Sequence, residues 1–333
     1  MPKKVALVTG GAGFIGSHMV DLLLRQDYEV RVLDNLSGGH ESNLSHHSNE
    51  PNLVFEKSDI LHVQPSNTLF KNVDVIFHFA GIGDIVPSIE KPLDYMNVNV
   101  QGTANILECA RDRSIPRFVY AASSSCYGLA STPTEETHAI NPKYPYALSK
   151  YLGEQVAFHW QKVYGTSVTS VRIFNAYGPR VRTTGAYGAV FGVFFKQKLE
   201  KKPFTVVGDG SQSRDFLYVT DVANAFLLAS NEIASGEVFN LGADNPQTIN
   251  RLIELLGGGQ TVFIPKRPGE PDCTWANTTK IKERLGWKPI ISFEEGVKNM
   301  LIDIDRWKDA PLWSKESIKE ATKSWFKYVG QKN

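Results

Sequence analysis

The sequence predicts an α/β protein built on a doubly wound parallel sheet, with a smaller C-terminal α/β lobe. Short apolar segments alternate with segments of helical spacing from the N-terminus to about Asp221, as expected for parallel strands joined by crossover helices. The chain has 333 residues, 42% of them hydrophobic, which is enough for a large buried core. Beyond Tyr177 the alternation weakens and glycine-containing loops become frequent, which indicates a second lobe.

The individual elements follow from the spacing of the apolar residues. Strands are expected at residues 4–9, 29–33, 53–57, 73–79, 118–122 and 167–173. Helices are expected at residues 14–26, 96–112, 145–164, 190–201 and 293–307, followed by an amphipathic stretch at 318–328. Each strand–helix–strand unit should be right-handed. We expect residues 1–179 and a return segment, 206–239, to form the first domain, and residues 180–205 and 240–333 to form the second lobe.

Charge and composition argue against several classes of protein. The 36 basic and 35 acidic side chains leave a net charge of +1, so there is no general electrostatic reason to bind nucleic acid or a membrane surface. The apolar run from Val5 to Val8 is much shorter than a signal-peptide core, and no segment reaches the roughly 20 apolar residues of a membrane span. The three cysteines lie far apart, which favours neither disulfides nor a zinc site. We expect a cytoplasmic protein without a metal.

Three glycines mark a phosphate-binding turn between the first strand and the first helix. Gly10, Gly13 and Gly16 occur where a tight turn, a close backbone approach and close helix packing favour a residue without Cβ. Asp34 ends the second strand, where a carboxylate can accept both ribose hydroxyls and repels a 2′-phosphate. No Lys or Arg follows it until Lys57, so NAD is favoured over NADP. A plain structural turn and a solvated loop acid are the alternatives.

A tyrosine and a lysine indicate redox chemistry. Tyr146 and Lys150 lie four residues apart on the helix that begins at Pro145, so both project from one face. An adjacent ammonium and a positive nicotinamide would favour the ionised phenol, whose usual pKa is about 10. Ser123 follows the preceding strand at the edge where α/β ligands bind, and its hydroxyl can bridge the substrate and the phenol. From the pair alone, an ordinary helix surface would remain the simpler interpretation.

Over nearly its whole length the chain resembles the extended short-chain dehydrogenase/reductases, most closely the nucleotide-sugar epimerases of the UDP-glucose 4-epimerase type. The resemblance implies a Rossmann domain that binds NAD, a lobe that binds a nucleotide sugar, and a homodimer formed through helices 96–112 and 145–164. The matching pieces, in chain order, are Thr9-Gly10-Gly11-Ala12-Gly13-Phe14-Ile15-Gly16, Asp34-Asn35-Leu36, Asp59-Ile60, His78-Phe79-Ala80-Gly81, Asn99 before Gly102-Thr103, Tyr146 with Lys150, Arg172-Ile173-Phe174-Asn175, Gly208-Asp209-Gly210, Arg214-Asp215-Phe216 and Arg267-Pro268-Gly269-Glu270.

The same resemblance implies roles for individual residues. Ser123, Tyr146 and Lys150 would be catalytic. The residues expected to bind NAD are Gly10, Gly13, Phe14, Ile15, Gly16, Asp34, Asn35, Ser37, Gly38, Asp59, Ile60, Phe79, Ala80, Gly81, Asn99, Tyr146 and Lys150. The residues expected to bind the nucleotide sugar are Ser125, Asn175, Val190, Thr205, Arg214, Arg267, Glu270 and Thr274. Arginine suits a diphosphate because its planar fork donates two hydrogen bonds to one phosphate.

Two positions decide which reaction is expected. The resemblance implies that 4,6-dehydratases carry an Asp-Glu pair where this chain has Ser124 and Ser125, and that decarboxylases usually keep a glutamate at the second position. Without these carboxylates the pocket is equipped to oxidise a sugar and return the hydride, which is epimerisation, most simply at C4. The resemblance implies a UDP-sugar as the substrate. A 4,6-dehydratase, a 4-keto reductase and a non-catalytic dinucleotide sensor are the alternatives.

Thr274 occupies the position where the resemblance places a gate residue beside the hexose, often a bulky tyrosine. A small threonine leaves space, so we expect an N-acetylated or otherwise enlarged sugar to be accepted. A gate rearranged by the neighbouring Cys273 or Trp275 is the alternative.

Overall fold

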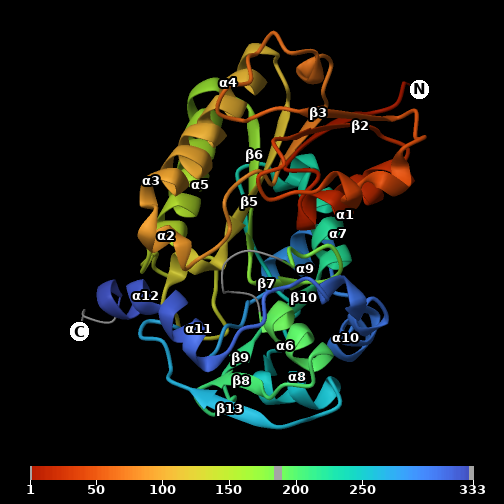
Figure 1. The fold of residues 1–333 in the computed structure, drawn as a ribbon. Coiled ribbons are helices and arrows are strands. Elements are labelled where there is room, and N and C mark those ends of the chain that lie inside the picture. The colour runs from red at the N-terminus through yellow and green to blue at the C-terminus, as the bar shows by residue number, and fades with distance from the viewer. Residues whose placement is uncertain (1, 184–189, 330–333) are drawn as a thin grey trace.

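A seven-stranded parallel sheet forms the centre of the computed structural model, which describes residues 2–183 and 190–329 (Figure 1). The strands lie in the order β3-β2-β1-β4-β5-β6-β11, which is the doubly wound order with one further strand. Their bounds are β1 Val5–Thr9, β2 Glu29–Asp34, β3 Leu53–Lys57, β4 Val75–His78, β5 Arg117–Ser123, β6 Ser167–Ile173 and β11 Val238–Leu241. The order reverses between β1 and β4, where ligands of open α/β sheets bind. The predicted fold class is confirmed.

Helices cover both faces of the sheet, which explains why strands such as β1 are buried along their whole length. On one face lie α1 (Phe14–Arg25) and α7 (Val219–Ala229). Their apolar residues, such as Met19 and Phe226, pack with buried residues of the sheet in one hydrophobic core cluster. On the other face lie α4 (Thr103–Asp112) and α5 (Pro145–Tyr164), which bury residues such as Ile106 in another cluster.

The long helix expected at 96–112 differs from the prediction. It begins earlier, as α3 (Pro92–Met96), because proline suits the first turn of a helix. A π-helical segment, Asn97–Gly102, then separates α3 from α4. Here the Asn99 side chain faces the loop after β4: its Oδ1 accepts a hydrogen bond of 2.8 Å from the Ile82 amide. The helix is therefore widened where it supports that loop.

The second lobe combines short sheets with helices around its own core. Tyr177, Phe191, Phe216 and Phe293 stack or meet edge to face in this core. Its strands form the pairs β7 (Asn175–Tyr177) with β10 (Phe216–Tyr218), β8 (Phe204–Val207) with β13 (Thr261–Ile264), and β9 (Ser213–Arg214) with β12 (Gln247–Thr248). Its helices include α6 (Val190–Leu199), α8 (Ile249–Leu255), α10 (Phe293–Ile302) and α11 (Lys315–Ala321), while α9 (Thr279–Leu285) lies against β11 and α12 (Lys323–Tyr328) ends the described chain.

Two expected helices end sooner than predicted. The helix expected at 190–201 ends at Leu199, and the one expected at 293–307 ends at Ile302. In the second case a 3-10 turn, Ile304–Trp307, follows and turns the Trp307 ring edge-on against Phe195, with 4.7 Å between the ring centroids. Burial of this indole thus outweighs continuation of the helix.

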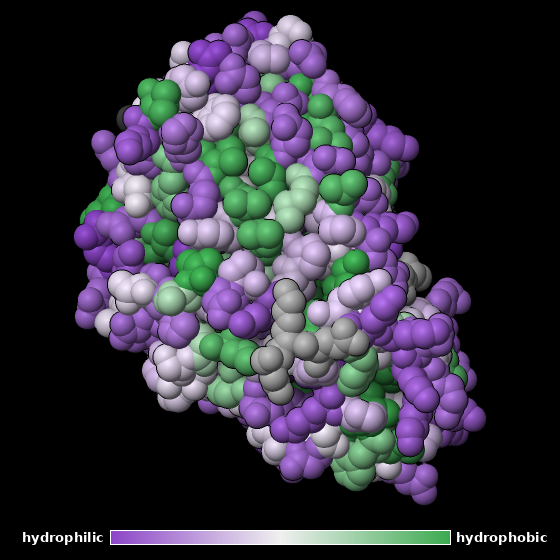
Figure 2. Space-filling view, turned by 90° about the vertical axis from the view of Figure 1, so that its left-hand side faces the viewer, coloured by the Kyte–Doolittle hydropathy of each residue, from purple (hydrophilic) through white to green (hydrophobic). Residues whose placement is uncertain are grey.

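One face of the molecule presents hydrophobic residues over the helices α3, α4 and α5 (Figure 2). The exposed members on these helices include Leu93, Leu148, Val163 and Tyr164. Among the residues that the structure describes, no helix is both long enough and apolar enough to cross a membrane.

A buried ion pair joins α5 to the sheet. Glu154 and Arg172 form two hydrogen bonds, of 2.6 and 3.0 Å, with side chains that are 1% and 6% exposed. Ser170 donates to the same carboxylate, and Arg172 also donates to the Tyr127 hydroxyl. These additional bonds satisfy both charges, as burial of an ion pair requires.

Replacing the buried carboxylate should therefore destabilise the protein strongly. We expect Glu154→Gln to lower the free energy of unfolding by about 3–5 kcal/mol, because the Arg172 charge then stays buried without its counter-ion. Urea denaturation followed by circular dichroism measures the effect. The matched control is Glu108→Gln, which breaks an exposed pair with Arg111 and should leave stability unchanged. Equal effects of the two substitutions would contradict this account.

Candidate active site

The glycine turn brings β1, β4 and the start of α1 into contact. Gly10 has a positive φ of 70°, and a Cβ there would lie 2.7 Å from the backbone nitrogen of Ala80. A Cβ on Gly16 would overlap the carbonyl oxygen of Gly10. The turn and the N-terminus of α1, which begins at Phe14, thus form a cradle of bare backbone. Such a cradle fits a pyrophosphate, because free N–H groups and the helix dipole favour an anion.

Asp34 is held at the edge of this cradle. Its Oδ2 accepts a hydrogen bond of 3.0 Å from the Ala12 amide, and its Oδ1 accepts one of 2.8 Å from the Leu36 amide. Burial raises the pKa of this carboxyl, while the two amides act in the opposite direction. A carboxylate has about four acceptor positions, so capacity for ribose hydroxyls remains.

The other predicted cofactor residues surround the same edge. Asn35, Ser37 and Gly38 form the exposed loop after β2, and Asn35 donates to Asp59 at 2.9 Å. Phe79, Ala80 and Gly81 follow β4, while Ile15 and Ile60 are partly or fully buried nearby in the sheet domain. The structure therefore brings the predicted set together along the carboxyl edge of the sheet.

Asn99 supports the loop after β4. Its amide both accepts from the Ile82 N–H and donates to the Ile82 carbonyl, at 2.8 and 3.1 Å, and it donates to the Ser149 hydroxyl at 2.9 Å. These bonds use most of its capacity. Asn99 thus fixes the loop that carries Gly81.

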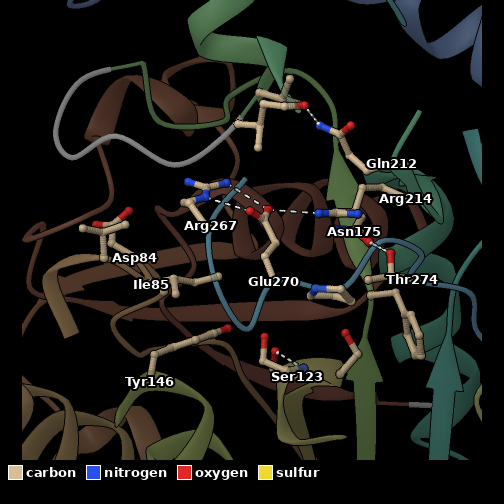
Figure 3. Close-up of a pocket in the computed structure, with 18 of the residues that line it drawn as sticks. Asp84, Ile85, Ser123, Tyr146, Asn175, Gln212, Arg214, Arg267, Glu270 and Thr274 are labelled. Atoms are coloured by element: carbon tan, nitrogen blue, oxygen red, sulfur yellow. Dashed lines mark hydrogen bonds and ion pairs between the residues drawn. The ribbon is translucent and has the colours of Figure 1, made fainter. Parts of the chain in front are cut away.

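The catalytic candidates meet where β5 ends and α5 begins. Ser123 is the last residue of β5, and Tyr146 and Lys150 lie on successive turns of α5. Figure 3 shows Ser123 and Tyr146 on the same side of the pocket, with their hydroxyls entering it. The Lys150 Nζ lies 4.5 Å from the centroid of the Tyr120 ring, and the Tyr120 hydroxyl donates to the Lys150 carbonyl at 3.1 Å.

Burial disfavours the charged forms of both Tyr146 and Lys150. Burial raises the pKa of Tyr146, and a hydrogen bond with Ser123 only partly offsets this. Burial also lowers the pKa of Lys150 to about 8, although Glu154 opposes it. Desolvation is thus the largest influence on the pKa of each group.

A cavity of about 440 Å³ opens above these hydroxyls, between the two lobes. Its wall includes Ser123 and Tyr146 at one end and an apolar surface that includes Phe191 and Phe194. All eight predicted nucleotide-sugar residues line it: Ser125, Asn175, Val190, Thr205, Arg214, Arg267, Glu270 and Thr274.

Two arginines and a glutamate form the charged end of the cavity. Glu270 lies between Arg214, at 2.9 Å, and Arg267, at 2.7 Å (Figure 3). Burial raises the pKa of the Glu270 carboxyl, but the two guanidinium groups outweigh this effect and hold the pKa below its usual value. The arrangement keeps both cations oriented in a partly buried place, which suits a ligand with two adjacent phosphates.

The predicted gate residue is tied to its neighbours. The Thr274 hydroxyl donates to the Asn175 side chain at 2.6 Å and accepts from the Asp215 amide at 3.3 Å. The adjacent Trp275 donates instead to Asp244. Of the three gate candidates, Thr274 is thus the one that faces the cavity.

Sequence reasoning missed several residues of the cavity wall. Tyr144 and Trp325 line it, as does Gln212, whose Oε1 is buried and has no hydrogen-bond partner among the described residues. Asp84, to which no role was given, also lines it and pairs with Arg182 at 3.2 Å. Only Tyr144 had a local signal, because it directly precedes the helix that carries Tyr146.

One group outside the cavity has the spacing of metal ligands. His46 and His47 each place Nε2 at 2.8 Å from the same oxygen of Asp21. Arg180 pairs with the other oxygen of Asp21 at 2.7 Å, so a cation already neutralises the carboxylate. We interpret this group as a tether that holds the segment after β7 against α1.

Comparison with known proteins agrees with this geometry. Residues 6–242 match the sequence model of the NAD dependent epimerase/dehydratase family. A putative UDP-glucose 4-epimerase of Methanocaldococcus jannaschii is 37% identical over 303 residues, which cover 89% of this chain and 96% of that protein.

Two solved structures are also similar. The first is UDP-glucuronic acid 4-epimerase from Bacillus cereus in complex with UDP-glucuronic acid and NAD, with a TM-score of 0.85, 31% identity and coverage of 91% of this chain and 99% of that one. The second is UDP-N-acetylglucosamine 4-epimerase from Methanobrevibacter ruminantium M1 in complex with UDP-N-acetylmuramic acid, with a TM-score of 0.85, 31% identity and coverage of 92% and 98%. The chain therefore belongs to the NAD dependent epimerase/dehydratase family, as its motifs predict.

Proposed function

We propose that the protein is an NAD-dependent 4-epimerase of a UDP-sugar. The observation that carries the proposal is the cavity itself, which has the Ser123 and Tyr146 hydroxyls at one end and the Arg214 and Arg267 guanidinium groups at the other. A molecule with a sugar joined to a diphosphate matches this polarity. The similar proteins named above act on UDP-sugars and support the same substrate class.

The chain's own residues handle the proton and the position of the sugar. When bound, NAD supplies a hydride acceptor that later returns the hydride. Tyr146 takes the proton of the C4 hydroxyl as the carbon is oxidised, and Ser123 holds that oxygen. After the 4-keto sugar has turned, Tyr146 returns the proton while the carbon is reduced on its other face. The cradle at Gly10 and the carboxylate of Asp34 hold the cofactor.

The cavity has serines where a dehydratase has carboxylates, and its own carboxylates are paired with arginines, which favours epimerisation over dehydration. Ser124 and Ser125 line the wall where a dehydratase would need its acid and base. Glu270 is engaged by two arginines, and Asp84 by Arg182. A 4,6-dehydratase that uses Asp84 remains the second candidate, because this carboxylate lies close enough to raise the pKa of Tyr146.

Gln212 supports a base that carries an N3–H donor, which uracil and thymine both do. Its side-chain nitrogen donates to the Val207 carbonyl at 2.9 Å, which fixes the orientation of the amide. Its Oε1 is left as a buried acceptor in the cavity wall. Uracil offers an N3–H donor, and an unsatisfied buried acceptor is costly enough to favour such a partner.

The sugar end has room for more than a plain hexose. Thr274 is small, and its hydroxyl is directed to Asn175 rather than into the space of the sugar. We therefore propose that an N-acetylated or otherwise enlarged sugar is accepted. A uronic acid is the alternative enlarged sugar, since Arg182 pairs with Asp84 of the cavity wall and offers a cation to a carboxylate.

Tyr146→Phe should abolish turnover without preventing binding. Loss of the proton acceptor should lower kcat by a factor of about 10²–10⁴. The measurement is NMR analysis of products from a panel of UDP-, GDP-, CDP- and dTDP-sugars. Full activity of the variant would disprove the mechanism, and loss of water or net use of NADH by the unaltered protein would favour a dehydratase or a reductase.

Thr274→Tyr should narrow the sugar specificity. We expect the ratio of kcat/KM for UDP-N-acetylglucosamine to that for UDP-glucose to fall by about tenfold or more, because the ring fills the space of the acetamido group. Thr274→Ser is the control, since it keeps the hydroxyl that bonds Asn175 without adding bulk. An unchanged ratio in the tyrosine variant would refute the gate.

The apolar face over α4 and α5 is the proposed interface of a homodimer. Sedimentation velocity should show a particle of twice the mass of one chain, and Val163→Glu should convert it to a monomer, because a buried unpaired charge opposes association. Ile302→Glu, on the exposed side of α10, is the control and should stay dimeric. A monomeric unaltered protein would exclude the dimer.

A further inference from the structure

The C-terminal helices connect the two lobes. Ile318 of α11 is buried in the core of the second lobe, whereas α12 lies beside α2 (Pro87–Glu90) of the sheet domain (Figure 1). The Ser324 hydroxyl donates to the Glu90 carboxylate at 2.8 Å across this contact. The end of the chain therefore crosses from one lobe to the other next to the cavity.

Trp325 of α12 holds the loop that carries Arg267. The indole is 4% exposed, and its Nε1 donates to the Pro268 carbonyl at 2.7 Å. The guanidinium carbon of Arg267 lies 5.9 Å from the centroid of the indole, within the range of a cation–π contact. Val329 reaches the same loop, because a Cβ on Gly269 would lie 3.1 Å from its Cγ1. Glu270 fixes Arg267 from within the cavity, and α12 fixes it from the other side.

The same indole also reaches the catalytic end of the cavity. The centroid of its ring lies 5.3 Å from that of Tyr144. The Tyr144 ring in turn stacks with the Tyr146 ring, with 6.5 Å between the centroids and 7° between the ring planes. Tyr144 and Trp325 both line the cavity. Trp325 thus contacts both the loop that carries Arg267 and Tyr144, which stacks on the expected base, Tyr146.

We propose that Trp325 is a positioning residue, through which the C-terminal helix α12 holds Arg267 ready for the diphosphate of the substrate. The inference rests on the proposed function, since it assigns Arg267 to that diphosphate. A loop that is already ordered loses little freedom when it binds, so its arginine contributes more to affinity. Trp325 contacts the Arg267 loop directly but reaches Tyr146 only through Tyr144, so its loss should weaken substrate binding more than it slows the chemical step.

The experiment measures binding of UDP to the NAD-loaded protein by isothermal titration calorimetry. For Trp325→Ala we expect the Kd for UDP and the KM for the UDP-sugar to rise about tenfold or more, with a much smaller change in kcat. Trp325→Phe keeps an aromatic ring beside Arg267 but loses the bond to Pro268, so its Kd should rise less, by about two- to fivefold. Circular dichroism establishes that each variant is folded, and the phenylalanine variant suffices if the alanine variant is not.

Trp287→Phe is the matched control. The Trp287 indole is 1% exposed and donates to the Asp221 carbonyl at 3.1 Å, but it does not line the cavity. Its replacement should affect stability and leave the Kd for UDP unchanged. Unchanged UDP binding in the folded Trp325 variants would overturn the inference, as would an equal weakening by Trp287→Phe. UDP binding without conversion of any UDP-sugar would instead refute the proposed function, and absence of UDP binding by the unaltered protein would refute both.

Discussion

Asp215 buries its carboxylate where separate stretches of the chain meet. It accepts hydrogen bonds from the amides of Ala243, at 2.8 Å, and Ala276, at 2.9 Å, and weaker ones from Asp244 and Asn245. Burial raises the pKa of this carboxyl, and the amides oppose the shift by stabilising the charged form. Arg214 immediately precedes Asp215, Thr274 lies close to Ala276, and Ala243 follows the end of β11. The hydrogen bonds of the Asp215 carboxylate therefore fix these three parts of the chain relative to one another.

Carboxylates of the protein partly offset the positive charge of the cavity. Glu270 neutralises part of the Arg214 and Arg267 pair, and Arg182 neutralises Asp84. Unpaired arginines in such a half-buried place would be costly, so the carboxylates allow the cations to be held in position. In the proposed complex, a diphosphate would compete with Glu270 for these guanidinium groups, and the contacts between Arg267 and Trp325 would limit how far the arginine moves in response.

The parts of the molecule whose structure depends on residues close in the sequence were predictable from it. The Gly10 turn, the strand ends at Asp34 and Ser123, and the pair on α5 all follow from short patterns, and the structure places them at one sheet edge. The π-helical segment at Asn97–Gly102 was not predictable, because its contact with Ile82 is tertiary and no residue pattern within the segment indicates it. Trp325 was missed for the same reason: nothing around it in the sequence indicates that it reaches Pro268 and Tyr144.

The pKa shifts at Tyr146 show why local pattern is insufficient for chemistry as well. The sequence predicts that Lys150 and the positive nicotinamide together favour the ionised phenol, and the structure adds that burial disfavours the charged form of both Tyr146 and Lys150. A positive charge beside the phenol would oppose this effect of burial and favour the ionised form. The nicotinamide of NAD carries such a charge in its oxidised form. In the proposed mechanism, activation of Tyr146 therefore depends on the NAD that the glycine cradle would hold.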